Sequence, residues 1–86
     1  MSVKIIYQMA SESTRDVIQF LRDFEKRTNQ KLEEVDPDSA HGAQICELYD
    51  VVQYPTVLAT TADGQLRNMW RGLPLPLIDE VSYYAE

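Results

Sequence analysis

Tyr54-Pro55-Thr56 decides the fold of this chain, because it stands between a helix-like stretch, residues 43–52, and a strand-like stretch, residues 56–61. A peptide bond before proline takes the cis form at modest cost, and a native cis proline usually marks a tight turn. A proline is also tolerated at the first position of a strand, where its missing donor costs no ladder hydrogen bond. We therefore predict that Pro55, with a cis peptide bond, is the junction around which the domain is built.

The sequence after Pro55 predicts a hairpin and a last helix. Residues 56–61 are apolar and β-branched, which favours a central strand. Asp63-Gly64 is a strong signal for a tight turn, and residues 65–71 alternate as a returning antiparallel strand. Pro76 suits the first turn of a final helix. The positions of that helix that we expect to face inward are Leu77, Ile78, Val81 and either Tyr84 or Ala85.

The start of the chain predicts a strand followed by a long helix. Residues 3–9 form a short apolar run of the kind that is buried on both faces of a sheet. Ser13 and Asp16 fit a capping box at the start of the helix, and Asn29 is a typical stop. The helix repeats its apolar residues at helical spacing. This stripe consists of Val17, Phe20, Leu21 and Phe24, widened by Ile18.

A polar strand and a second helix fill the middle of the chain. Residues 31–35 are polar, which predicts an edge strand. Asp38 or Ser39 is expected to cap the second helix, whose first turn is weakened by Gly42. The expected apolar stripe of this helix consists of Ile45, Leu48, Tyr49 and Val52.

The element order is therefore β-α-β-α-β-β-α in a single domain, residues 1–86. The first two strands form a right-handed parallel unit and the last two form a hairpin. An α/β fold follows, with a four-stranded mixed sheet and helices on both faces. We expect the first strand and the strand that begins at Thr56 to lie together at the centre.

The composition excludes several classes of function. The net charge of −6 argues against nucleic acid and anionic membranes as partners, since both need a basic face. Cys46 is the single cysteine, so no disulfide can form within the chain. The first residues lack the pattern of a signal peptide, and no apolar run approaches the length of a membrane span. These observations predict a cytoplasmic protein.

This order, with a proline before the third strand, resembles the thioredoxin/glutaredoxin superfamily in its minimal, glutaredoxin-sized form. The resemblance lies in residues 48–58, in Asp63-Gly64-Gln65-Leu66 and in Arg71-Gly72. These stretches are similar to the family pattern of a helix that ends near a tyrosine, a cis Pro-Thr, an apolar strand, a hairpin and a glycine before the last helix. The resemblance implies a thioredoxin-like fold over essentially the whole chain.

The chain departs from the family pattern at the residues that carry the family's chemistry, which implies that this chemistry is lost. The family uses two cysteines, C-x-x-C, at the start of the first helix, where the helix terminus helps to form a thiolate. Ser11 and Thr14 have the matching spacing here, and hydroxyl groups cannot form disulfides. Dithiol oxidoreductase activity is thereby excluded, and we expect no catalytic residues. Glutathione binding is disfavoured because Glu12 and Asp16 would repel an anion, so no cofactor is expected.

Two other candidate sites have simpler interpretations. Cys46 lies beside the apolar stripe of the second helix, where a free cysteine usually acts as a small hydrophobe. Asp36, Asp38 and His41 could crowd a metal ion, but acids at a turn before a helix usually serve as caps. We therefore predict no metal site.

Two hypotheses for function remain. The first is a redox-inactive module that binds a protein or extended peptide in the groove around the cis proline. It resembles the thioredoxin-like modules of sensor kinases, which also lack C-x-x-C and dock on partners. The second is a monothiol redox or redox-sensing protein that acts through Cys46. The candidate partner-binding residues are Ser11, Ser13, Thr14, Tyr54, Pro55, Thr56, Trp70 and Gly72. The oligomeric state is left open.

Overall fold

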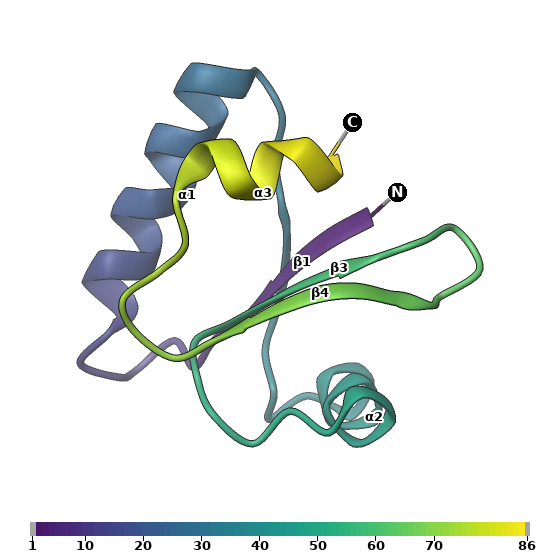
Figure 1. Ribbon diagram of the computed structural model, residues 1–86. Helices are drawn as coiled ribbons and strands as arrows, with labels where there is room; N and C mark the ends of the chain where they lie inside the picture. The colour runs from purple at the N-terminus through teal and green to yellow at the C-terminus, as the bar shows by residue number, and fades with distance from the viewer. Residues whose placement is uncertain (1, 86) are drawn as a thin grey trace.

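A computed structural model describes residues 2–85 as a four-stranded sheet with three helices (Figure 1). The observed order, β-α-β-α-β-β-α, confirms the predicted one. Along the chain the elements are β1 (Ser2–Ile6), α1 (Thr14–Thr28), β2 (Glu33–Val35), α2 (Ala40–Tyr49), β3 (Thr56–Thr60), β4 (Leu66–Arg71) and α3 (Ile78–Ala85).

The strand order in the sheet is β2-β1-β3-β4. β1 pairs with β2 in parallel, and β3 is antiparallel to both β1 and β4, so the sheet is mixed as expected. The register places Thr56 opposite Ile6 on one side and opposite Arg71 on the other. β1 and β3 are therefore the central strands, and the polar strand β2 lies at an edge, as predicted.

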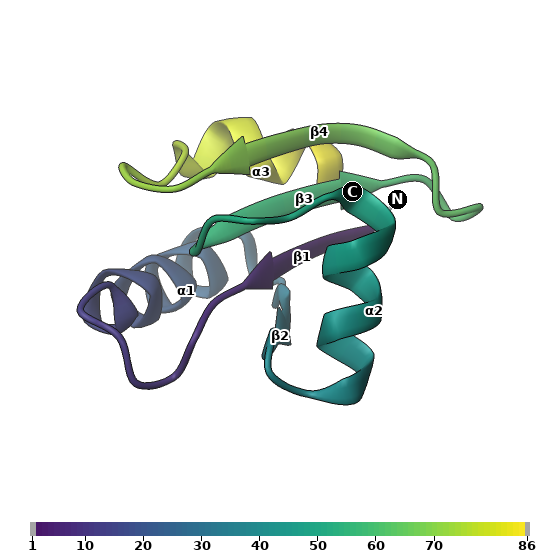
Figure 2. The ribbon, with the colours of Figure 1, turned by 90° about the horizontal axis from the view of Figure 1, so that it is seen from below.

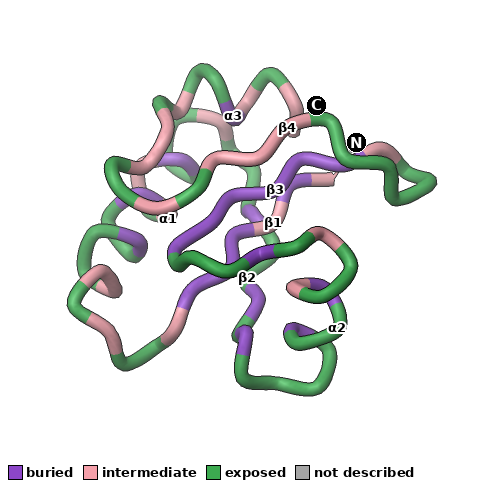
Figure 3. The backbone as a smooth tube through the Cα atoms, turned by 60° about the horizontal axis from the view of Figure 1, so that its bottom comes forward, coloured by how far each residue is buried: buried purple, intermediate pink, exposed green. Residues whose placement is uncertain are grey.

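Helices cover both faces of the sheet (Figures 1 and 2): α1 and α3 lie on one face and α2 lies on the other. The larger core, on the α1 and α3 side, includes Val17, Phe20 and Phe24 from α1 and Val81 from α3. The smaller core includes Ile45 from α2. The central strands are buried from both sides (Figure 3), which explains their nearly continuous apolar sequences.

Four residues that were predicted to face inward are exposed. Ile18 is 40% exposed because α1 contacts the sheet through a narrower stripe than predicted. Leu48 is 73% exposed because α2 packs through Ile45 and Tyr49 instead. Val52 and Leu77 are exposed because both lie outside the helices to which they were assigned.

Of the two predicted helix caps, the structure confirms the one at α2 and contradicts the one at α1. Ser39 caps α2 as predicted, since its Oγ accepts a hydrogen bond from the Gly42 N–H at 2.9 Å. The predicted capping box of α1 is wrong: Ser13 occupies the N-cap position, but its side chain makes no capping hydrogen bond. Its backbone is already helical, with φ −83° and ψ −5°, whereas a capping serine normally has an extended backbone.

Within residues 2–85, the longest helix, α1, has 15 residues, and no helix is long and apolar enough to cross a membrane.

Candidate functional site

One end of the sheet gathers most of the predicted partner-binding residues. Because Ile6, Thr56 and Arg71 are neighbours across three strands, the segments that adjoin them share this end. They are the β1–α1 loop, the Tyr54-Pro55 segment and Gly72. Both ribbon views place the β1–α1 loop, the start of β3 and the end of β4 at the same end of the molecule (Figures 1 and 2).

The segment around Pro55 is held by its own hydrogen bonds. The Tyr54–Pro55 peptide bond is cis, and so is the Leu73–Pro74 bond. The Gly72 N–H donates to the Pro55 carbonyl oxygen at 2.8 Å, which extends the pairing of β3 with β4. The Thr56 hydroxyl donates to the Gln53 carbonyl oxygen at 2.7 Å, and Thr56 is fully buried. Pro55 and Thr56 therefore act as a scaffold that fixes the residue before them.

Tyr54 is the accessible residue of this segment. Its side chain is 37% exposed. Within residues 2–85, neither its backbone N–H nor its backbone carbonyl has a backbone hydrogen-bond partner. We use the name cis-proline site for Tyr54, Pro55, Thr56 and Gly72.

The hydroxyl groups of the β1–α1 loop bond to one another and to the loop backbone. The Ser11 Oγ lies 3.0 Å from the Ser13 Oγ and 3.2 Å from the Thr14 Oγ1, and it donates to the Gln8 carbonyl oxygen at 3.2 Å. The Thr14 Oγ1 accepts the Ser11 N–H at 3.1 Å and can donate to the Gln8 or Met9 carbonyl oxygen. Ser11 and Thr14 therefore close the loop that leads into α1.

Trp70 and Gly72 differ in their role. Trp70 is half-buried and packs edge-on against Tyr84, with 5.6 Å between ring centroids, and its side chain packs against the larger core. Gly72 has a φ of +70°, which favours glycine, where β4 leaves the sheet. Gly72 is therefore part of the cis-proline site, whereas Trp70 packs against the larger core.

Cys46 lies on α2, where it is half-buried against the smaller core. Its Sγ accepts a hydrogen bond from the Tyr54 hydroxyl across 4.0 Å. Burial first, and the hydrogen bond to Cys46 second, raise the pKa of the Tyr54 phenol. The thiol thus contacts the side chain of the cis-proline site without lying at the start of α1.

The acids before α2 take part in local contacts. The Asp36 carboxylate accepts the Asp38 N–H at 2.9 Å, which closes the turn before the helix. The His41 Nε2 lies 3.9 Å from a Glu33 carboxylate oxygen on the edge strand β2. Asp36 thus closes the turn with its carboxylate, Asp38 takes part through its backbone N–H, and the His41 ring lies beside Glu33.

A partly buried hydrogen bond that the sequence did not reveal joins Tyr7, the residue after β1, to β2. The Tyr7 side chain is 3% exposed, and its hydroxyl donates to a Glu34 carboxylate oxygen at 2.5 Å. Burial, followed by the hydrogen bond to Glu34 and the charge of Glu34, raises the pKa of Tyr7 to about 12. The pair ties the start of the β1–α1 loop to the edge strand β2.

Tyr7 is expected to make stability depend on alkaline pH. Because its pKa is raised on folding, the stabilisation is complete below pH 10 and is lost as the pH rises towards 12. Tyr7→Phe should lower the free energy of unfolding by about 1–1.5 kcal/mol at neutral pH. The difference between wild type and variant should shrink above pH 10 in urea denaturation. A constant difference from pH 8 to 11 would contradict this role for the phenol.

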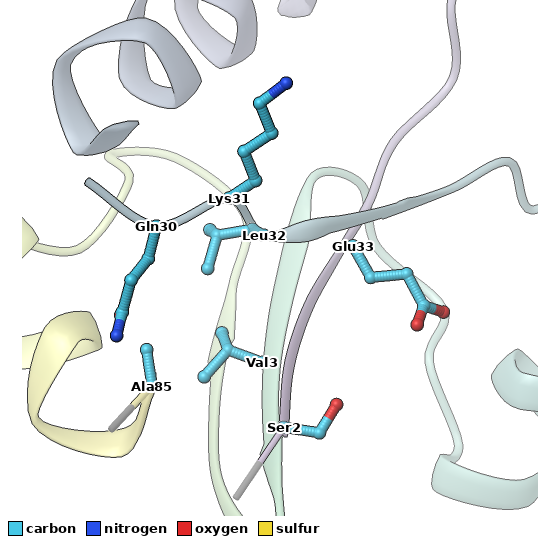
Figure 4. Close-up of a pocket in the computed structure, with 7 residues that line it drawn as sticks. All are labelled: Ser2, Val3, Gln30, Lys31, Leu32, Glu33 and Ala85. Atoms are coloured by element: carbon cyan, nitrogen blue, oxygen red, sulfur yellow. The ribbon is translucent and has the colours of Figure 1, made fainter. Parts of the chain in front are cut away.

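A cavity of about 430 Å³ lies at the opposite end of the sheet (Figure 4). The figure shows the side chains of Val3, Leu32 and Ala85 at its apolar side, with Glu33 pointing away from them. Because Ser2 and Ala85 are the first and last residues that the structure describes, we assign no site to this cavity.

These features define a thioredoxin-like fold that lacks the C-x-x-C motif. The chain is similar to the structure of thioredoxin 1 from Thermosipho africanus TCF52B, with a TM-score of 0.67 and 13% sequence identity over 98% of this chain and 89% of that one. It is also similar to a designed protein, with a TM-score of 0.68 and 18% identity over 96% of this chain and 70% of that one. No protein-family model matches the sequence, and no curated protein matches it.

Proposed function

We propose that this chain is a redox-inactive interaction module that binds a protein or an extended peptide at the cis-proline site. The observation that carries the proposal is the backbone of Tyr54, which has no backbone partner among residues 2–85 and is held in place by the bonded residues that follow it. An extended peptide can pair with such a backbone as an added strand does. The exposed Tyr54 ring would then contact a side chain of the peptide.

The same geometry supports binding without covalent chemistry. Ser11 and Thr14 use their hydroxyl groups to close the loop, so neither is poised as a nucleophile. Cys46 is half-buried on α2 and hydrogen-bonded to Tyr54, so the monothiol alternative has less support. Under this proposal the protein is not an enzyme, and slow alkylation of native Cys46 at neutral pH is expected.

The proposal predicts where a bound peptide changes the NMR spectrum. Peptides selected from a displayed library on the wild-type protein should shift the amide signals of residues 10–14 and 53–57. Tyr54→Ala should weaken their binding about tenfold, because a buried interface tyrosine often contributes that much. Isothermal titration provides the affinities.

Tyr83→Ala is the matched control, since Tyr83 is an exposed tyrosine on α3, outside the cis-proline site. It should leave the affinity unchanged. Amide shifts confined to α2, or equal losses for the two tyrosine variants, would sink the proposal.

A further inference from the structure

A groove of about 650 Å³ runs between α1 and the segment that joins β4 to α3. Its apolar part is formed by Phe20 on α1 and by Leu73, Pro74 and Leu75 on the connecting segment. Asp16 and Asp23 of α1 also line it, together with Gln19. The groove shares no residue with the cis-proline site.

The apolar part of the groove is only partly used by the fold. Leu75 packs against the larger core, and Phe20 is 9% exposed. Leu73, in contrast, is 52% exposed, and Pro74 is exposed beside it. An apolar side chain from a partner would therefore bury surface that the chain itself leaves open, which is the main source of binding energy at such sites.

The two aspartates leave their charge available. Within residues 2–85, Asp16 has no hydrogen bond or ion pair through its side chain, and the Asp23 carboxylate accepts only from the Gln19 Nε2, at 3.0 Å. The basic residues of α1 do not line the groove. Asp16 also favours the helix start electrostatically, but that role does not require an adjoining apolar surface. The groove thus combines two free negative charges with an open apolar surface.

The spacing of the charges limits the kind of partner. Asp16 and Asp23 are seven residues apart on one helix, a rise of about 10 Å. In an extended peptide, residues three apart span about 10 Å as well. We propose that the groove binds an extended peptide in which an apolar side chain lies between two lysines or arginines three residues apart. This second interaction surface goes beyond the proposed function and does not depend on it.

The probe for this surface is the capped peptide Gly-Lys-Leu-Ser-Lys-Gly, titrated into the whole chain and followed by amide shifts. The shifts should fall on Gln19, Phe20, Leu73 and Leu75. The double variant Asp16→Asn with Asp23→Asn should weaken binding about tenfold, since exposed ion pairs contribute modestly each. The wild-type affinity should also fall when salt is added, because salt screens exposed charges.

A second double variant, Glu47→Gln with Asp63→Asn, is the matched control, since it changes the net charge equally at exposed positions away from the groove. It should bind as the wild type does, and so should Tyr54→Ala, which separates this proposal from the cis-proline site. If both double variants weakened peptide binding equally, the binding would depend only on the net charge of the protein, and the proposal would be overturned. Unchanged binding of a peptide with serine in place of leucine, binding of a glutamate analogue, or no binding at millimolar concentration would also overturn it.

Discussion

Phe24→Ala is expected to lower the free energy of unfolding by about 3–5 kcal/mol, because it removes a fully buried aromatic side chain and leaves a cavity. Phe24 lies in the larger core and stacks on Phe20, with 6.2 Å between ring centroids. A domain of this size has about 5–10 kcal/mol of stability in total, so the variant should be close to unfolding at room temperature. Urea denaturation followed by circular dichroism measures the change.

Ile18→Ala on the same helix is the control, and its cost should stay within about 0.5 kcal/mol because Ile18 is exposed. If Phe24→Ala leaves no folded protein to measure, Phe24→Leu should still cost more than Ile18→Ala. Similar costs for Phe24→Leu and Ile18→Ala would mean that α1 packs through a different face from the one described.

The fold was predictable because independent local signals agreed. The stripe of Val17, Phe20 and Phe24 marked a helix, Asp63-Gly64 marked a hairpin, and the apolar run from Thr56 marked a central strand. Each of these elements can be predicted from the residues within it alone. The order of the elements is then compatible with only a few sheet topologies. Agreement of this kind between local preference and overall fold is typical of natural sequences.

The face of α2 was predicted less well because its end depends on the backbone. Asp50 takes a left-handed conformation, with a φ of 57°, and ends the helix before the predicted stripe is complete. Val51 then turns into the smaller core and Val52 points away from it. Sequence spacing continued the helical pattern across this break, so it assigned the wrong valine to the core.

The location of the candidate site was predicted from the sequence, but its hydrogen bonding was not. The resemblance located Tyr54 and the β1–α1 loop, whereas the free backbone of Tyr54 depends on the register of β3 with β4. The Tyr7–Glu34 hydrogen bond likewise joins residues 27 apart and follows from the pairing of β1 with β2. The groove between α1 and Leu73 is formed by segments that only the folded chain brings together.

Gly42→Ala is expected to destabilise the domain by about 3 kcal/mol, at the upper end of the usual cost of overpacking. A β-carbon at position 42 would lie 1.8 Å from the Asp36 carbonyl oxygen and 2.9 Å from the Ser39 Oγ. The Asp36 oxygen cannot move away freely, because it accepts the Ser39 N–H at 3.1 Å and the Ser39 hydroxyl at 2.7 Å. Relieving the clash therefore costs the cap of α2 as well.

The sequence alone predicts the opposite sign, which makes the change informative. Glycine weakens a helix by about 1 kcal/mol relative to alanine, so Gly42→Ala would stabilise α2 if only helix propensity mattered. Ala43→Gly is the matched control: Ala43 is exposed, and its replacement should cost only about 1 kcal/mol. Thermal and urea denaturation of both variants compare the two effects directly. A variant with alanine at position 42 that is as stable as the wild type would mean that α2 does not approach the Asp36 backbone as described, and that Gly42 only weakens the helix.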